Sequence, residues 1–151
     1  MNITAGVMWD YMDLSRSREN RYLEYTDMKK VLLYVWQLPQ NLIGLLLRLF
    51  WKTEFKIEYK DKTIRVCSKF PSGISLGETI LLKNAIPVDI KHEYGHTRQS
   101  LYLGPLYLFV IGIPSILWAA TYKLFKKDYY TSFYTEIWAD KLGGVKRSER
   151  H

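Results

Sequence analysis

Apolar residues are concentrated in two stretches of this chain that carry no charge. The first covers residues 31–47, VLLYVWQLPQNLIGLLL, and the second covers residues 100–122, SLYLGPLYLFVIGIPSILWAATY. The first has a polar centre with Pro39, and a proline breaks or kinks a helix. We therefore expect two short apolar helical pieces there. The second is long enough for a membrane span, but Gly104-Pro105 and Gly112 to Pro114 interrupt it.

The segment between these stretches has the patterns of strands followed by a helix. Residues 55–68, FKIEYKDKTIRVCS, alternate and have a turn at Lys60-Asp61-Lys62, which predicts a hairpin. A third strand is expected from Thr79 to Leu82. Pro87 and Asp89 suit the first turn of a helix, which we expect to run to about Tyr102. A last helix is expected from Thr131 or Ser132 to Gly143-Gly144.

These elements predict an α+β protein with a small antiparallel sheet. The chain has 151 residues, of which 48% are hydrophobic, so it can form one domain with a real core. Within a single domain 1–151, we expect an N-terminal helical and apolar segment, 1–51, and a core, 52–151, with an apolar insertion at 100–122. The N-terminus lacks the pattern of a cleaved secretory signal.

Cysteine content and charge indicate the cellular compartment and the kind of partner. Cys67 is the only cysteine, so no internal disulfide can form, which favours a reducing compartment, and its strand-like surroundings predict a buried position. The net charge is +7, but the basic residues are spread along the chain and resemble no nucleic-acid-binding module. Because basic residues flank the apolar stretches, a membrane surface is the expected partner, and nucleic acid is not.

The stretch HEYGH, residues 92–96, is the strongest chemical signal. On a helix, His92 and His96 lie one turn apart on one face and can bind one zinc ion. Glu93 can reach a zinc-bound water and act as the general base, without being a ligand itself. Gly95 suggests close approach of another element or of substrate, since glycine weakens a helix. The alternative is an ordinary helix with three polar residues.

Zinc needs a third protein ligand, and the only other histidine is His151 at the end of the chain. Glu, Asp or Cys must therefore supply it. Glu136 and Asp140 lie four apart on the last predicted helix. Glu136 would complete a site with two histidines and one glutamate, and Asp140 would accept the second N–H of a ligating histidine. Taken alone, this pair is more typical of an ordinary acidic face on an exposed helix.

His92-Glu93-x-x-His96 followed by Glu136-x-x-Ala139-Asp140 resembles the gluzincin zinc metallopeptidases. The Glu-x-x-Ala-Asp form is most similar to their membrane-associated branches, the heat-shock-protease and CAAX-prenyl-protease group and the β-lactam-sensor group. The resemblance covers roughly residues 63–143 and implies a zincin-like fold, in which an edge strand ahead of the first active helix binds an extended peptide. The strand near Ile80 to Leu82 stands where that edge strand is expected.

The resemblance also implies roles: His92, His96 and Glu136 as zinc ligands, Glu93 as general base and Asp140 as the partner behind a ligand. The chain is much smaller than those membrane enzymes and has no second histidine to stabilise an oxyanion. Tyr129, Tyr130 and Tyr134 are the candidates for that task, with no basis for choosing among them.

A shared metal constrains the second apolar stretch. If residues 100–122 crossed a bilayer once, His96 and Glu136 would lie about 30 Å apart on opposite sides. What remains is a hairpin bent at Gly112 to Pro114, a dip into one leaflet or a helix buried in protein. We expect the two apolar stretches to pack together and rest on the cytoplasmic side of a membrane; the alternative is the core of a soluble cytoplasmic domain.

The expected function is zinc-dependent hydrolysis of peptide bonds in a peptide or protein substrate. The alternative is a non-catalytic protein, in which zinc stabilises the fold and the apolar segments bind a membrane partner.

Overall fold

The computed structural model describes residues 23–125 and 133–146. The chain divides into two compact units, Met1–Val35 and Trp36–His151. In the first unit the described residues are helical, and this helix ends at residue 36. The prediction of a single domain stays a prediction. All further elements belong to the second unit.

The first apolar stretch lies on two helices. A turn at Gln37 separates the helix that ends at residue 36 from α2, Leu38–Phe50. The break falls just before Pro39, which lies in the first turn of α2, where its missing N–H costs no hydrogen bond.

A four-stranded sheet follows, made of β1 (Phe55–Tyr59), β2 (Lys62–Val66), β3 (Gly73–Leu76) and β4 (Thr79–Leu82), in the order β1-β2-β4-β3. The predicted hairpin and the strand at residues 79–82 are confirmed. The prediction of a wholly antiparallel sheet was wrong, because β2 and β4 pair in parallel. Sequence analysis missed β3, which crosses to the far edge before the chain returns as β4.

This strand order also corrects the expected edge strand. The segment Ile80 to Leu82 belongs to β4, which lies between β2 and β3 and is buried along its whole length. The edges of the sheet are β1 and β3.

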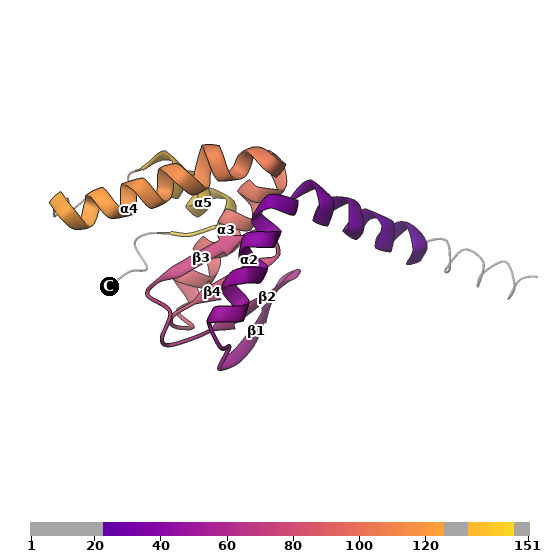
Figure 1. Ribbon diagram of the computed structural model, residues 1–151, viewed down its shortest axis with the longest axis horizontal. Coiled ribbons are helices and arrows are strands. Elements are labelled where there is room, and N and C mark those ends of the chain that lie inside the picture. The colour runs from indigo at the N-terminus through magenta and orange to yellow at the C-terminus, as the bar shows by residue number, and fades with distance from the viewer. Residues whose placement is uncertain (1–22, 126–132, 147–151) are drawn as a thin grey trace, which may run out of the picture. The chain divides into compact units, whose positions relative to one another are not determined.

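The two faces of the sheet are covered by different helices (Figure 1). Ile80 and Leu82 pack with Ile90 of α3, Pro87–Leu103, on one face. Leu81 points the other way, since side chains alternate along a strand, and packs with Cys67 and with Leu47 of α2. The prediction that Cys67 is buried is confirmed.

The second apolar stretch bends sharply after α3. It forms η1 (Gly104–Leu106), η2 (Leu108–Gly112) and α4 (Ile113–Phe125). Within residues 23–125 and 133–146, no single helix combines the length and the apolar composition needed to cross a bilayer. Pro87–Leu106 and Leu108–Thr121 together have this length and composition, but the pair is bent by 119°.

The bend is not at Gly112 to Pro114, where the hairpin alternative placed it. Gly104 has a φ of +52°, and a side chain there would collide with the ring of Trp36. At this point the two apolar stretches meet, because Gln40 of α2 donates a hydrogen bond to the carbonyl of Gly104. The last helix, α5, runs from Tyr134 to Gly143, with Gly144 as a left-handed cap, so it ends where predicted. Residues 131 and 132, its expected start, lie outside the described residues.

Candidate metal centre

Two imidazoles from one face of α3 point toward each other. His92 and His96 lie one turn apart on α3, and their Nε2 atoms are 3.2 Å from each other. Both rings are largely buried and face each other at right angles. The prediction that His92 and His96 lie one turn apart on one helix face is confirmed.

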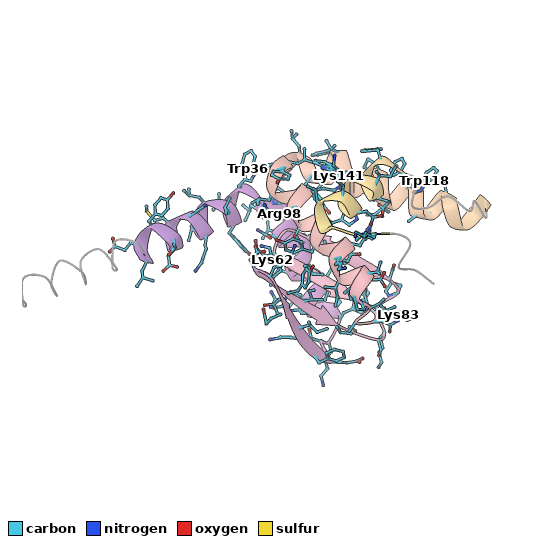
Figure 2. All side chains as sticks on the ribbon, turned by 180° about the vertical axis from the view of Figure 1, so that it is seen from behind. Trp36, Lys62, Lys83, Arg98, Trp118 and Lys141 are labelled. Atoms are coloured by element: carbon cyan, nitrogen blue, oxygen red, sulfur yellow. The ribbon has the colours of Figure 1, made fainter. Side chains whose placement is uncertain are left out.

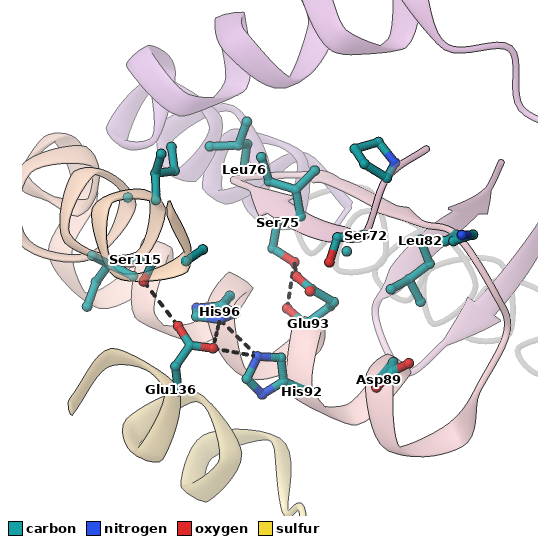
Figure 3. A pocket seen from close by; sticks show the side chains of 18 of the residues that line it. Ser72, Ser75, Leu76, Leu82, Asp89, His92, Glu93, His96, Ser115 and Glu136 are labelled. Carbon is teal, nitrogen blue, oxygen red and sulfur yellow. Dashed lines mark hydrogen bonds and ion pairs between the residues drawn. The ribbon is translucent and has the colours of Figure 1, made fainter. Parts of the chain in front are cut away.

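Glu136 of α5 completes the cluster. Its Oε2 lies 3.2 Å from Nε2 of His92 and 3.8 Å from Nε2 of His96. Ligands bound about 2.0–2.1 Å from a tetrahedral metal are separated by about 3.3–3.4 Å. Among the described residues, these three buried side chains lie close enough to hold one metal ion (Figure 3).

Close packing of two helices brings Glu136 to the histidines. A Cβ added to Gly95 of α3 would lie 1.9 Å from the carbonyl oxygen of Ala139 on α5. One added to Gly143 would lie 2.0 Å from the carbonyl oxygen of Lys91. Glycines at both contacts let the backbones touch. The expectation that another element closely approaches Gly95 is confirmed.

Partners behind the histidines fix which ring nitrogens face the centre. Nδ1 of His92 is 2.6 Å from Oδ1 of Asp140, and Nδ1 of His96 is 2.7 Å from Oε1 of Gln99. The Gln99 amide is oriented because its Nε2 donates to the carbonyl of Thr135. Both partners are acceptors, so each Nδ1 carries a hydrogen, and in its neutral form each ring would turn the Nε2 lone pair inward.

This donor set suits a divalent cation. Two imidazole lone pairs and one carboxylate oxygen converge on one point, and they repel one another unless a cation or a proton lies between them. Two histidines and one glutamate, with room for a fourth ligand, form a ligand set found in catalytic zinc sites.

Without a metal, a proton takes this place. Burial by itself lowers the pKa of His92, but hydrogen bonds to Asp140 and Glu136 outweigh it and raise that pKa from 6.5 to about 10. Burial by itself raises the pKa of Glu136, but hydrogen bonds from His92 and His96 bring it well below 4.5. A metal must therefore displace a proton from His92 at neutral pH.

Glu93 lies beside the three donors and is not one of them. It is buried, and its Oε2 is 2.7 Å from the hydroxyl of Ser75 on β3, which also lies 2.8 Å from the backbone carbonyl of Glu93. The helix and the edge strand thus hold the carboxylate between them (Figure 3).

A cleft of about 580 Å³ opens over these side chains. It is bounded by β3, α3, η2, α4 and α5, and its lining includes His92, Glu93, His96 and Glu136. Tyr107, which sequence analysis did not single out, also lines it and donates a hydrogen bond to the carbonyl of Ser75.

The tyrosines proposed for the oxyanion find no support in the described residues. The hydroxyl of Tyr134 donates to the carbonyl of Val110, and Tyr134 does not line the cleft. Tyr129 and Tyr130 lie outside the described residues.

Sequence analysis missed three polar residues that hold the site. Gln99 lies three positions after His96, so helical spacing alone could have found it. Ser115, a polar residue within the second apolar stretch, is 3.1 Å from Oε1 of Glu136 and 2.8 Å from the hydroxyl of Thr135. Ser75 lies on β3, a strand that was not predicted.

Comparison of the chain with models of protein families, with curated proteins and with solved structures gives no match in any of the three.

Proposed function

We propose that this protein is a zinc metallopeptidase of the gluzincin type. The observation that carries the proposal is the convergence of His92, His96 and Glu136 on one point, with the Glu93 carboxylate held next to it inside a cleft. Asp140 and Gln99 orient the two imidazoles, as second partners of ligating histidines do in metal sites.

His92, His96 and Glu136 would hold the metal. Zinc bound there would supply a water of lowered pKa and a Lewis acid for the carbonyl of the scissile bond. Glu93 would accept the proton of the attacking water and pass it to the leaving amine. Ser75 keeps the Glu93 carboxylate in position for both transfers. Tyr107 brings a second buried hydroxyl to the cleft, and its hydrogen bond to the Ser75 carbonyl fixes the strand beside Glu93.

The edge of β3 offers a place for an extended peptide. Leu76 pairs with Thr79 across the turn, and the N–H of Lys83 bonds to the carbonyl of Ser72. Because the hydrogen-bonding direction alternates along an antiparallel strand, the backbone groups of Gly73 and Ser75 face away from β4. The Ser75 carbonyl already accepts the Tyr107 hydroxyl, which leaves the Ser75 N–H and the backbone groups of Gly73 for a substrate strand. Both residues line the cleft, so such a strand would pass beside Glu93.

Peptide hydrolysis by the zinc-loaded full chain tests this proposal. A mixture of unstructured peptides is incubated with wild-type protein and with Glu93→Gln, and new termini are identified by mass spectrometry. We expect Glu93→Gln to keep its zinc and to lose at least about 100-fold in turnover, the usual contribution of a general base. Glu58→Gln, on an exposed position of β1, is the matched control.

Two results would contradict the proposal. If the wild type binds zinc but cleaves no peptide, zinc only stabilises the fold. If both proteins cleave at the same rate, the activity comes from elsewhere.

A further inference from the structure

Helix α2 has its two amide residues on the inside. Gln40 and Asn41 are buried, as is Gly44, which contacts Thr79 of the sheet. Gln40 donates hydrogen bonds to the hydroxyl of Ser100 and to the carbonyl of Gly104. Asn41 accepts one from the backbone N–H of Glu78. The inner face of α2 is thus attached to the protein by specific polar contacts.

The outer face of α2 is entirely apolar. We call the following residues the α2 outer face; at helical spacing they form one stripe, and each is at least 40% exposed: Leu38, Leu42, Leu45, Leu46, Leu49 and Phe50. Leu49 and Phe50 are the most exposed, at 74% and 78%. Leu106 of η1, the element that α2 contacts near its N-terminus, is 60% exposed.

This polarity is the reverse of that of a surface helix in water, which turns its apolar stripe to the core. Rotating α2 to bury its leucines would break the hydrogen bonds of Gln40 and Asn41. An exposed apolar stripe of this kind marks a binding surface, and an apolar environment outside the helix would cover it.

Charge indicates which apolar environment this is. From Met28 to Thr53 the sequence has no acidic residue, and its charged residues are Lys29, Lys30, Arg48 and Lys52. Arg48 and Lys52 are exposed at the C-terminal end of α2. Basic residues next to an apolar helix face are attracted to anionic lipid headgroups. A second copy of this chain that packed through the same face would bring the same four basic residues to the contact.

Just before α2, Trp36 attaches the chain to the C-terminal end of α3. The indole N–H of Trp36 donates to the carbonyl of Leu101 near the C-terminal end of α3, and the Trp36 ring is about half exposed (Figure 2). Tryptophan prefers the boundary between lipid and water. We propose that the α2 outer face lies in the interface of an anionic bilayer and holds the protein on the membrane surface, with the helix parallel to that surface.

Binding of the full chain to vesicles tests this inference. The vesicles are phosphatidylcholine alone and a three-to-one mixture of phosphatidylcholine with phosphatidylglycerol, and bound protein is measured by flotation. We expect wild type to float with the mixed vesicles, and Leu46→Ser/Leu49→Ser to lose about tenfold or more in affinity, since each leucine side chain buries a large apolar area. Ile86→Ser/Ile137→Ser removes two similarly exposed residues elsewhere and is expected to bind like wild type.

A second variant separates charge from apolar burial. Arg48→Gln/Lys52→Gln is expected to weaken binding to the mixed vesicles severalfold, with less effect on vesicles without charged lipid. All these substitutions are at exposed positions. An unfolding midpoint equal to that of the wild type is the check that each variant is folded.

The inference is overturned if wild type binds neither kind of vesicle, or if Leu46→Ser/Leu49→Ser floats as well as wild type. A protein that is dimeric without vesicles and becomes monomeric in the leucine variant would assign the α2 outer face to a second copy. Membrane binding does not depend on the proposed peptidase function, so Glu93→Gln and zinc-free protein are expected to float like wild type.

Discussion

Gly95 of α3 lies directly against Ala139 of α5, so closely that a Cβ on Gly95 would be 1.9 Å from the Ala139 carbonyl oxygen. This contact sets the distance between the two helices that carry the three metal donors. The absence of a side chain at Gly95, together with that at Gly143, lets the helices approach so that Glu136 reaches His92 and His96.

Gly95→Ala is therefore expected to push α5 away from α3. Overpacking costs about 1–3 kcal/mol of the free energy of unfolding, and the displaced Glu136 lowers metal affinity as well. Urea unfolding of the chelated protein and a zinc competition assay measure the two effects. At Gly112 an added Cβ meets Leu108 at an ordinary 3.5 Å, so Gly112→Ala is the control. Wild-type zinc affinity in Gly95→Ala would refute this account of the contact.

Asp140→Asn tests the partner behind His92. The amide keeps the size of the side chain but loses the negative charge that stabilises the N–H of the ring. Substitutions of this kind lower metal affinity by about 10- to 100-fold. The dissociation constant for zinc is measured against a competing chelator. Asp89→Asn, at the start of α3, is the matched control and is expected to bind zinc like wild type.

Ser75→Ala tests the hydroxyl that holds Glu93. Loss of a hydrogen bond to a charged group costs about 1.5–3 kcal/mol, equivalent to about 10- to 150-fold in rate if it is lost from the transition state. We expect kcat to fall with little change in KM or in zinc content. Ser68→Ala, which removes a hydroxyl bonded to Glu54 on the surface, is expected to leave kcat unchanged. An unchanged kcat in Ser75→Ala would show that Glu93 needs no such support.

The pH dependence of stability in metal-free protein follows from the raised pKa of His92. Its folded pKa of about 10 exceeds the 6.5 of the unfolded chain, so its contribution is fully present below pH 6.5 and is lost as the pH rises through 10. Glu136 acts in the opposite sense: its contribution is present above pH 4.5 and is lost as the pH falls.

Urea midpoints of chelated wild type and His92→Gln between pH 6.5 and 10 measure the His92 contribution. The stability difference between the two proteins is expected to shrink steadily as the pH rises. A constant difference over this range would contradict a protonated His92 in the metal-free site.

Local sequence patterns predicted the parts of the site that depend on helical spacing. The spacing in HEYGH predicted that two donors share one helix face, and Gly143-Gly144 predicted where α5 ends. The parallel pairing of β2 with β4 could not be predicted, because the order of strands depends on long-range packing that four-residue strands do not encode locally. The short β3, with Gly73 and Ser75, has too little apolar alternation to be recognised.

The orientation of α2 shows a second limit. Its apolar pattern was visible, but a pattern alone does not say whether the stripe faces the core. The buried hydrogen bonds of Gln40 and Asn41, made with residues far along the chain, decide that. The hairpin alternative put the bend at Gly112 to Pro114 for a similar reason, since the constraint at Gly104 comes from Trp36, far along the chain.

The most direct test of the metal centre is the zinc content of purified full-length protein. Elemental analysis is done on wild type and on Glu136→Ala after both have been supplied with zinc and then desalted. We predict close to one zinc per wild-type chain and a large loss in the variant, because Glu136 supplies the third donor. A folded wild type that retains no zinc would contradict the assignment of His92, His96 and Glu136 as ligands, and the peptidase proposal would fail with it.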